Sequence, residues 1–299
     1  MRERIGVIGV GNMGAPMAAR LLERGFDIVV RDVRSEAEAP LLAAGGRRAD
    51  APIEIARSCS AVLVVVVDAA QIDDVLNGSQ GLLQALRPGQ LVLFHSTIAP
   101  ADAARFAAAV AQRGALPLDA PISGGPARAR TGQLSMMVAC SDATFERARP
   151  LLDALAARVF RVGTQAGLGA TMKLVNNLLA GTYLAAGAEA FAIGRAAGLD
   201  PQTMADVFGA SSGQSWILSD RLGRLVAGDP HTHAQMHILA KDMRLALELA
   251  RSVGGPDSVG ASASATFAAA AAAGLKDADD SALIRWLAER TRPSDGGSR

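Results

Sequence analysis

Three glycines near the N-terminus have a spacing that can bind phosphate groups. They lie in the pattern G-x-G-x-x-G, as Gly9-Val10-Gly11-Asn12-Met13-Gly14. The segment follows a branched-aliphatic run at 5–8 and leads into an amphipathic stretch at 17–24. In this context the first glycine permits a tight turn, the second lets the backbone approach a pyrophosphate, and the third lets the helix pack on the strand. The free N–H groups of the helix start then face the anion. An ordinary glycine turn is the alternative.

An acidic residue, Asp32, follows Gly14 by 18 residues, at the end of the next strand-like run, 28–31. This spacing suits a carboxylate that hydrogen-bonds the ribose hydroxyls of an adenosine. Because a carboxylate repels a 2′-phosphate, Asp32 favours NAD over NADP. The flanking Arg31 and Arg34 weaken this discrimination, so NADP stays possible. Asp32 is also compatible with a role as cap of the following helix.

Two further segments carry polar groups at the expected ends of strands. Ser123-Gly124-Gly125 offers a hydroxyl and backbone amides without side-chain shielding, a nest for a carboxylate. From the residues alone, a glycine-rich connection is the simpler explanation. Thr97 follows the strand-like run 91–95, at a strand end where open α/β sheets bind ligands. A turn or cap role fits Thr97 equally.

A lysine and an asparagine share one face of an expected helix. Lys173 and Asn177 are four residues apart among apolar neighbours. Their polar groups must reach solvent, a partner or a cavity. A desolvated lysine has a lowered pKa, which suits proton transfer near neutral pH. A solvated stripe on the helix is an equal alternative.

The elements that position these residues alternate in the first half of the chain. Strand-like runs at 5–8, 28–31, 61–67 and 91–95 are separated by amphipathic stretches such as 17–24 and 101–112, with weaker strand candidates at 115–118, 135–140 and 159–162. Such alternation predicts a doubly wound, mostly parallel sheet. The run 61–67 is apolar at every position, as expected for a central strand covered on both faces.

The second half of the chain is helical in pattern. Residues 169–198 contain no proline and repeat apolar residues at helical spacing. Further helices are expected at 202–208, 215–227, 234–253, 262–274 and 281–289, and a frayed end at 291–299. The sequence therefore predicts an α/β domain at 1–165 and an all-α domain at 166–299, joined by a long helix.

Composition excludes several classes of protein. The 299 residues suggest two domains at about 150 residues each. Half of them are apolar and a fifth charged, which excludes global disorder. The chain has 30 Lys and Arg and 29 Asp and Glu, a net charge of +1, which does not indicate binding to nucleic acid or to an anionic membrane. Outside an alanine tract the longest apolar run is 61–67, and no signal-peptide pattern is present. A cytoplasmic protein is expected.

Metal binding is not expected. Cys59 and Cys140 are too few for a disulfide framework and too far apart for a metal pair. His231, His233 and His237 have no cysteine nearby, and surface or capping roles fit them better.

Together these motifs resemble the β-hydroxyacid dehydrogenase family, which includes 3-hydroxyisobutyrate, tartronate semialdehyde and L-threonate dehydrogenases. The resemblance covers nearly the whole chain. It implies an N-terminal Rossmann domain, a long interdomain helix, an all-α domain, homodimers or homotetramers, and NAD(P)-dependent oxidation of a small 3-hydroxy acid. It rests on the glycine motif, Ser96-Thr97 with Pro100, the segment 119–125 followed by Gly132, the helix with Lys173 and Asn177, and Lys241-Asp242.

The resemblance also implies residue roles. Lys173 would be the general acid/base, and Asn177 would help to hold it and the substrate. Ser123, Gly124 and Gly125 would bind the substrate carboxylate. The cofactor would be contacted by the glycine motif, by Asp32, by Val67 and Asp68 where many members carry a Leu-Pro-type pair, and by Thr97 and Lys241 at the nicotinamide end.

Several alternatives stay open. The segment Gly213-Gln214-Ser215-Trp216 looks closest to the L-threonate branch, where Trp216 would line the substrate pocket, although a core tryptophan fits as well. Asp242 would orient Lys241 or form a weak surface ion pair. The same site would serve an NADPH-dependent semialdehyde reductase. A non-catalytic dinucleotide-binding sensor or scaffold is a further alternative, but it would not need Lys173, Asn177 and the Ser-Gly-Gly segment.

Overall fold

The computed structural model describes residues 3–291 of the chain. The chain divides into two compact units, which we call the N-terminal unit (Met1–Lys173) and the C-terminal unit (Leu174–Arg299). The frayed end expected at 291–299 lies outside the described residues, apart from Thr291.

The N-terminal unit is built on one mixed sheet with the strand order β3-β2-β1-β4-β5-β6-β8-β7, and β9 pairs with β8. The strands β1 to β6 run parallel, whereas β8 is antiparallel to β6 and β7. The order 3-2-1-4-5-6 is that of doubly wound dinucleotide-binding folds. The strands are β1 (Arg4–Ile8), β2 (Asp27–Arg31), β3 (Arg47–Arg48), β4 (Ala61–Val64), β5 (Leu91–Phe94), β6 (Leu116–Asp119), β7 (Ile122–Ser123), β8 (Leu134–Ala139) and β9 (Ala156–Gly163).

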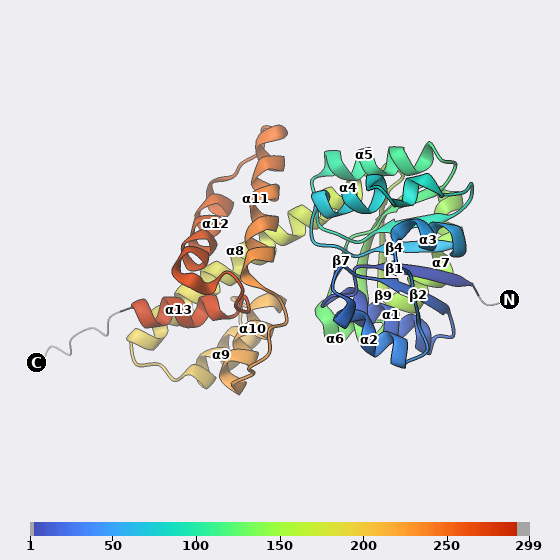
Figure 1. Cartoon of the computed structure of the whole chain (residues 1–299). Coiled ribbons are helices and arrows are strands. Elements are labelled where there is room, and N and C mark those ends of the chain that lie inside the picture. The colour runs from blue at the N-terminus through green and yellow to red at the C-terminus, as the bar shows by residue number, and fades with distance from the viewer. Residues whose placement is uncertain (1–2, 292–299) are drawn as a thin grey trace, which may run out of the picture. The chain divides into compact units, whose positions relative to one another are not determined.

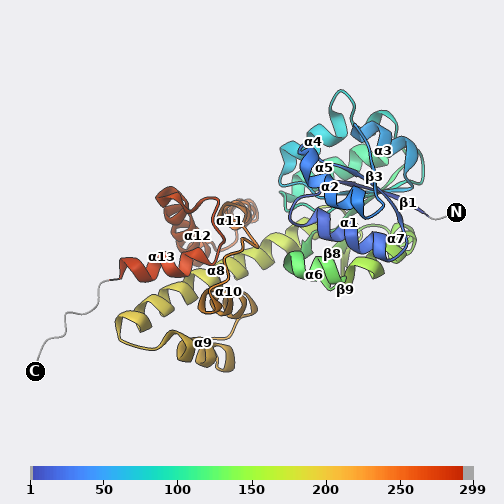
Figure 2. The same cartoon turned by 60° about the horizontal axis from the view of Figure 1, so that its bottom comes forward.

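Helices cover both faces of this sheet because its central strands are apolar on both sides. In β4, Ala61 and Leu63 face one core, and Val62 and Val64 face the other. Figures 1 and 2 show α1 and α6 on one face and α3, α4 and α5 on the opposite face. The first core receives α1 (Gly14–Glu23), α2 (Ser35–Ala43), α6 (Gly125–Thr131) and α7 (Asp142–Leu155); the second receives α3 (Pro52–Ser58), α4 (Ala69–Asn77), the 3₁₀ turn η1 (Leu82–Gln84) and α5 (Pro100–Ala111).

The strand β4 is shorter than the apolar run predicts. It ends at Val64, although the Val65 N–H still donates to the Ile8 carbonyl. The chain then turns away because Asp68 caps α4, accepting a hydrogen bond from the Gln71 amide at 2.9 Å. The two-residue strands β3 and β7 were not predicted, because such short strands carry no periodicity.

The C-terminal unit is helical. The helix α8 (Leu168–Ala196) begins in the N-terminal unit and continues through the C-terminal unit, where Figures 1 and 2 show α9 and α10 on one side of it and α11 and α12 on the other. Leu184, Phe191, Met243 and Phe267 are among its buried core residues. The other elements are α9 (Pro201–Ala210), α10 (Trp216–Ala227), α11 (Met236–Ser252), α12 (Ser258–Ala270), the π-helical turn η2 (Ala271–Leu275) and α13 (Ala282–Arg290). The predicted fold class is confirmed.

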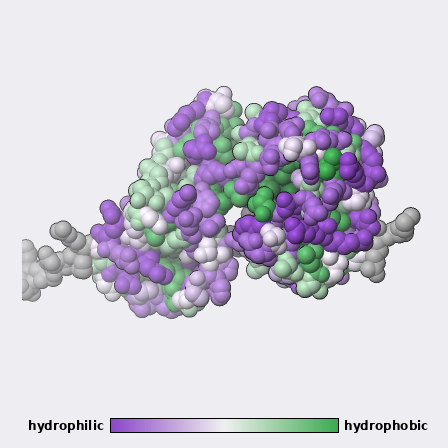
Figure 3. Space-filling view, viewed as in Figure 1, coloured by the Kyte–Doolittle hydropathy of each residue, from purple (hydrophilic) through white to green (hydrophobic). Residues whose placement is uncertain are grey.

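One stretch of the described residues, Ser258–Leu275, is long and apolar enough to cross a membrane by length and composition, with a mean hydropathy of 1.3. Core helices also pass this test when they are mostly buried, but only 22% of this stretch is buried. One side of α12, with Ala263, Phe267 and Ala270, packs into the helical core. The outer surface over α12 is pale green in Figure 3, as alanines make it.

A buried histidine directly follows β5. His95 is 3% exposed, and its Nδ1 lies 2.7 Å from the Ala120 carbonyl oxygen. Because a carbonyl oxygen only accepts, Nδ1 carries the proton and donates it. Nε2 is buried without a hydrogen-bond partner among residues 3–291. Burial lowers the pKa of His95 to about 4. The imidazole is therefore neutral near pH 7, where it ties β5 to the chain after β6.

This histidine predicts a loss of stability in mild acid. The unfolded chain binds a proton at His95 near the ordinary pKa of 6.5, whereas the folded chain binds it only near pH 4. The free energy of unfolding should therefore fall by about 3 kcal/mol between these values. The variant His95→Asn, which keeps a donor for Ala120, should lack this part of the fall. Urea unfolding of both proteins at about pH 7 and about pH 4.5 measures the difference. The same pH dependence in both proteins would contradict the assignment.

Candidate active site

The residues of the N-terminal unit that are proposed to hold a cofactor lie at one edge of the parallel sheet, whereas Lys241 lies on α11 in the C-terminal unit. The glycine motif follows β1, Asp32 follows β2, Asp68 lies beyond β4, and Thr97 lies beyond β5. Because these strands are parallel and adjacent, their carboxyl ends lie along the same edge. The strand order reverses between β1 and β4, the place where such sheets bind ligands.

The glycine turn has the geometry that phosphate binding needs. Gly9 has a φ of +88°, and its N–H donates to the Arg31 carbonyl at 2.9 Å. A Cβ on Gly14 would lie 1.8 Å from the Gly9 oxygen, so α1 packs against the turn only with glycine there. A Cβ on Gly11 would meet nothing closer than the Arg34 guanidinium at 3.5 Å, so the backbone at Gly11 is open to approach. These residues fit the pyrophosphate of a dinucleotide.

Asp32 joins this turn to the end of β2. It is 8% exposed, and its Oδ2 accepts a hydrogen bond from the Val10 N–H at 2.7 Å. Its Oδ1 accepts one from the Arg34 N–H at 2.9 Å. The N-cap residue of α2 is Arg34, so the alternative that Asp32 caps this helix is wrong. A carboxylate has about four lone-pair positions, and those left over remain for ribose hydroxyls.

The loops that follow β4 and β5 are hydrogen-bonded to each other, and the loop after β4 is also hydrogen-bonded to α4. The Ser96 hydroxyl donates to the Val66 carbonyl at 2.6 Å, which ties the end of β5 to the end of β4. The Val67 N–H donates to Gln71 Oε1 at 2.8 Å, and the Asp68 carboxylate is engaged as the cap of α4. Thr97 is half-buried and does not cap α5, whose N-cap is Ala99. The cap alternative for Thr97 is therefore wrong.

The Ser-Gly-Gly segment is positioned by a short strand. Ser123 pairs with Ser135 across β7 and β8. Gly124 and Gly125 follow with φ of +134° and +75°, values that favour glycine, and α6 begins at Gly125. Backbone conformation alone therefore accounts for both glycines, and a carboxylate-binding role is a further step that the geometry permits.

A residue without a predicted role, Asp119, anchors the start of the helix that carries Lys173. It is 3% exposed at the end of β6, and its Oδ2 accepts hydrogen bonds from the N–H groups of Gly167 at 2.7 Å and Ala170 at 3.0 Å. Burial raises the pKa of this carboxyl, and the backbone amides oppose that rise. The first turn of α8 is therefore held directly beside the chain that leads to Ser123.

Lys173 lies one turn further along α8 and is 7% exposed. The alternative of a solvated stripe is therefore wrong. Asn177, one more turn along, is 8% exposed, and its Nδ2 donates to Asp242 Oδ2 at 2.7 Å. Lys241 Nζ lies 2.8 Å from Asp242 Oδ1. Because Asp242 is only 3% exposed, the alternative of a surface ion pair is also wrong. Asp242 links the two residues, and its only sequence signal is its place beside Lys241.

The structure also places Trp216 and the histidines that were considered as metal ligands. Trp216 is the first residue of α10 and 48% exposed, so the core alternative is wrong. Asp229 pairs with His231 and His233, each at 2.8 Å. Within residues 3–291, no group of three His, Cys, Asp or Glu is placed to hold a metal ion.

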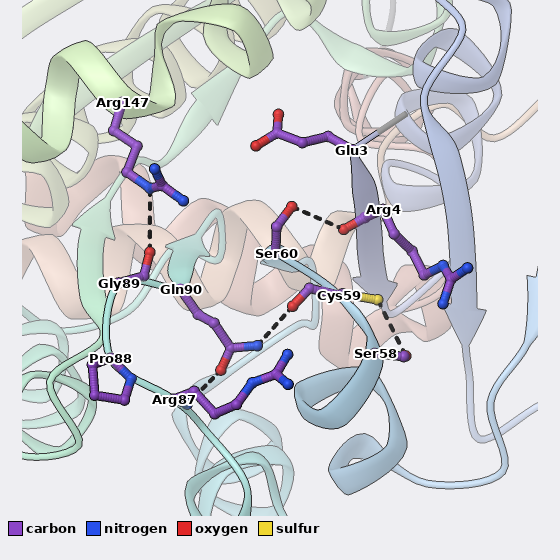
Figure 4. A pocket seen from close by; sticks show the side chains of 10 residues that line it. All are labelled: Glu3, Arg4, Ser58, Cys59, Ser60, Arg87, Pro88, Gly89, Gln90 and Arg147. Carbon is purple, nitrogen blue, oxygen red and sulfur yellow. Dashed lines mark hydrogen bonds between the residues drawn. The ribbon is translucent and has the colours of Figure 1, made fainter. Parts of the chain in front are cut away.

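A cavity of about 690 Å³ lies at the opposite, amino edge of the sheet, where Arg4 begins β1 and Gln90 precedes β5. Figure 4 shows the Ser60, Gln90 and Arg147 side chains hydrogen-bonded to backbone groups of the same wall. The Gln90 amide donates to the Cys59 carbonyl at 2.6 Å, and Arg147 Nε donates to the Gly89 carbonyl at 3.2 Å. These groups hold the wall together, and none of the predicted site residues lines the cavity.

Comparison with known proteins agrees with this arrangement. A family model described as the NAD binding domain of 6-phosphogluconate dehydrogenase matches residues 4–163. A second, described as NAD-binding of NADP-dependent 3-hydroxyisobutyrate dehydrogenase, matches residues 167–287. The chain is 39% identical to an L-threonate dehydrogenase of Escherichia coli (strain K12) over 290 residues, which cover 97% of this chain and 96% of that one.

Solved structures agree over the same length. A 3-hydroxyisobutyrate dehydrogenase from Salmonella typhimurium matches with a TM-score of 0.88 and 36% identity, covering 95% of this chain and 99% of that one. Psf3 in complex with NADP+ and 2-OPP matches with a TM-score of 0.88 and 30% identity, with the same coverage of both chains. The chain thus belongs to the β-hydroxyacid dehydrogenase family, and it is an oxidoreductase of hydroxy acids that uses a nicotinamide dinucleotide.

Proposed function

We propose that the protein oxidises a small 3-hydroxy acid with NAD and that Lys173 is the general acid/base. The observation that carries this proposal is the burial of Lys173 on a helix whose first turn is held by Asp119. Burial keeps this amine out of bulk water, where a positioned group can take part in proton transfer with a bound substrate. L-Threonate is the first substrate to test because the Escherichia coli relative is named for it. The other members of the panel are 3-hydroxyisobutyrate, oxidised with NAD, and tartronate semialdehyde, reduced with NADH.

Each predicted site residue of the N-terminal unit then has a role in binding. The turn from Gly9 to Gly14 holds the pyrophosphate of the dinucleotide, and Asp32 holds the adenosine ribose. Val67, Asp68 and Thr97 contact the cofactor beyond the switch point. The Ser123 hydroxyl and the N–H groups of Gly124 and Gly125 bind the substrate carboxylate. A bound nicotinamide would supply the hydride chemistry at carbon 3 of the substrate in either direction.

Lys173 moves the proton that accompanies this hydride. In oxidation its neutral amine accepts the proton of the substrate hydroxyl, so that the carbonyl forms as the C–H bond breaks. In reduction its ammonium polarises the carbonyl and gives the proton back. Asn177 contributes to holding the substrate, and Lys241 contacts the nicotinamide end. Orientation of the reactants by the carboxylate clamp contributes to the rate alongside proton transfer.

Asp32 favours NAD over NADP, and the arginines around it leave NADP as a second cofactor. A semialdehyde reductase that runs mainly with NADPH would use the same residues. Rate measurements in both directions distinguish it from a dehydrogenase. The sensor or scaffold alternative is set aside because the family consists of enzymes. We propose residues 1–165 as the cofactor domain, residues 166–299 as the substrate and oligomerisation domain, and the cytoplasm as its location.

We also propose that the protein is a homodimer or homotetramer that associates through α8. Apolar residues recur along this helix at helical spacing, yet they are about half exposed: Val175 and Leu179 at 51%, Tyr183 at 46% and Ile193 at 61%. The alanines at 186 and 190 continue the same stripe and are also exposed. An apolar stripe of this length on a monomer is unusual. A second copy of the same helix is a matching partner because two-fold contacts pair a surface with itself.

Replacing Lys173 by alanine tests the catalytic assignment. The turnover number with L-threonate and NAD should fall by about 10³-fold, because proton transfer loses its acceptor. The dissociation constant for NADH, measured by fluorescence, should stay within a few-fold of the wild-type value. Lys276→Ala, which removes an exposed lysine of the C-terminal unit, is the matched control and should leave both unchanged. Full turnover in Lys173→Ala would remove the mechanism.

A charge on the α8 stripe tests the proposed association. Leu179→Glu should weaken assembly by about tenfold or more, because a carboxylate would be buried in an apolar contact. Light scattering after size exclusion measures the mass across a dilution series. Val253→Glu places the same charge at an apolar residue that is 71% exposed outside the stripe, and it should assemble like the wild type. A monomeric wild type, or an unaffected Leu179→Glu, would refute this interface.

A further inference from the structure

A buried carboxylate with no role so far, Glu38 of α2, supports the edge where the adenosine would bind. Its side chain is 0% exposed. Its Oε1 accepts a hydrogen bond from the Asp32 N–H at 2.7 Å. A fully buried glutamate is rare unless it is paired, so its partners show what holds it there.

Those partners are two arginines at the carboxyl edge of the sheet. Arg31 Nη1 lies 3.7 Å and Arg48 Nε lies 3.3 Å from the Glu38 carboxylate. Arg31 ends β2, and Arg48 ends β3 beside Val30, so both guanidinium groups stand next to the Asp32 turn. Both remain partly exposed, Arg31 at 24% and Arg48 at 46%, and can be reached by a ligand.

The same carboxylate fixes the conformation of the turn. Glu38 binds the Asp32 N–H, the Arg31 guanidinium donates to the Asp32 carbonyl, and the Asp32 carboxylate binds the N–H groups of Val10 and Arg34. The N–H, the carbonyl and each carboxylate oxygen of Asp32 thus have a partner within the turn, and the carboxylate keeps lone pairs for a ribose. Three arginines (31, 34 and 48) lie here with the buried carboxylates of Asp32 and Glu38 and with the exposed carboxylate of Asp50, 3.5 Å from Arg48 Nε, so the charges at this point balance.

We propose that Glu38 determines which dinucleotide the enzyme prefers. Its buried charge neutralises Arg31 and Arg48, which would otherwise attract the 2′-phosphate that distinguishes NADP from NAD. The proposal rests on placement of the adenosine ribose at Asp32, but not on Lys173 or on the substrate. Removal of the Glu38 charge raises the local charge by one unit, which favours a ligand carrying a dianionic phosphate over one carrying a hydroxyl.

The experiment is binding of NADH and NADPH to the full chain without hydroxy acid, followed by nucleotide fluorescence. In Glu38→Gln the ratio of the two dissociation constants should shift toward NADPH by about tenfold, and the shift should shrink in high salt. Glu36→Gln is the matched control. It removes the same charge from the same helix at an exposed position, and its ratio should stay near the wild-type value.

A double variant tests whether Arg48 is the cation that Glu38 restrains. Arg48→Gln alone should shift the ratio toward NADH, and Glu38→Gln with Arg48→Gln should return it near the wild-type value. If Glu38→Gln does not fold, comparison of the double variant with Arg48→Gln measures the effect of the same charge in a background where Arg31 is the remaining arginine beside position 38.

Equal weakening of both nucleotides in Glu38→Gln would overturn the proposal and leave Glu38 a purely structural residue. An equal shift in Glu36→Gln would do the same, because any charge on α2 would then suffice. A wild-type preference for NADPH would reverse the proposed cofactor choice, but the change of ratio between wild type and Glu38→Gln would still decide the role of Glu38.

Discussion

The hydrogen bond from the Val10 N–H to the Asp32 carboxylate holds the proposed cofactor site together. It crosses 22 residues of chain and joins the glycine turn after β1 to the end of β2 at a distance of 2.7 Å. The turn itself is set by Gly9 and Gly14, whose backbones approach too closely for any side chain. The amides proposed to bind phosphate and the carboxylate proposed to bind ribose are therefore placed relative to each other before any ligand arrives. Such preorganisation lowers the cost of ordering the site on binding.

The same requirement, that buried polar groups be paired, arranges the other proposed site residues. Asp119 is paired with the backbone of α8 and so positions Lys173. In the C-terminal unit, Asp242 is paired with Asn177 and Lys241. Glu38 is paired with the Asp32 amide and two arginines. In each case a buried carboxylate determines where another functional group stands. These three acids are positioning residues, and only Asp242 was assigned a role from the sequence, as a residue that would orient Lys241.

Sequence reasoning found what local spacing encodes. The glycine motif, Asp32 and the pair Lys173 and Asn177 lie within one turn or one strand–helix–strand unit, so their geometry follows from spacing. The pairing of Asp119 with Ala170 spans 51 residues, and that of Asn177 with Asp242 spans 65. Contacts between residues so far apart in the sequence cannot be predicted from a local pattern. Nor does periodicity tell which apolar face is buried: along α8, Leu179 and Tyr183 fit a core pattern, yet they are about half exposed. The strand β4 ends at Val64, before the end of the apolar run, because Asp68 caps α4 and the chain must leave the sheet to reach that helix.

A crystal structure of the enzyme with NAD and L-threonate tests the central claim most directly. The account predicts that the Lys173 amine lies within about 2.6 to 3.2 Å of the substrate hydroxyl on carbon 3, with the substrate carboxylate on Ser123 and the two glycines that follow. A bound substrate whose hydroxyl is met by another group, with the Lys173 amine turned to bulk water, would contradict it.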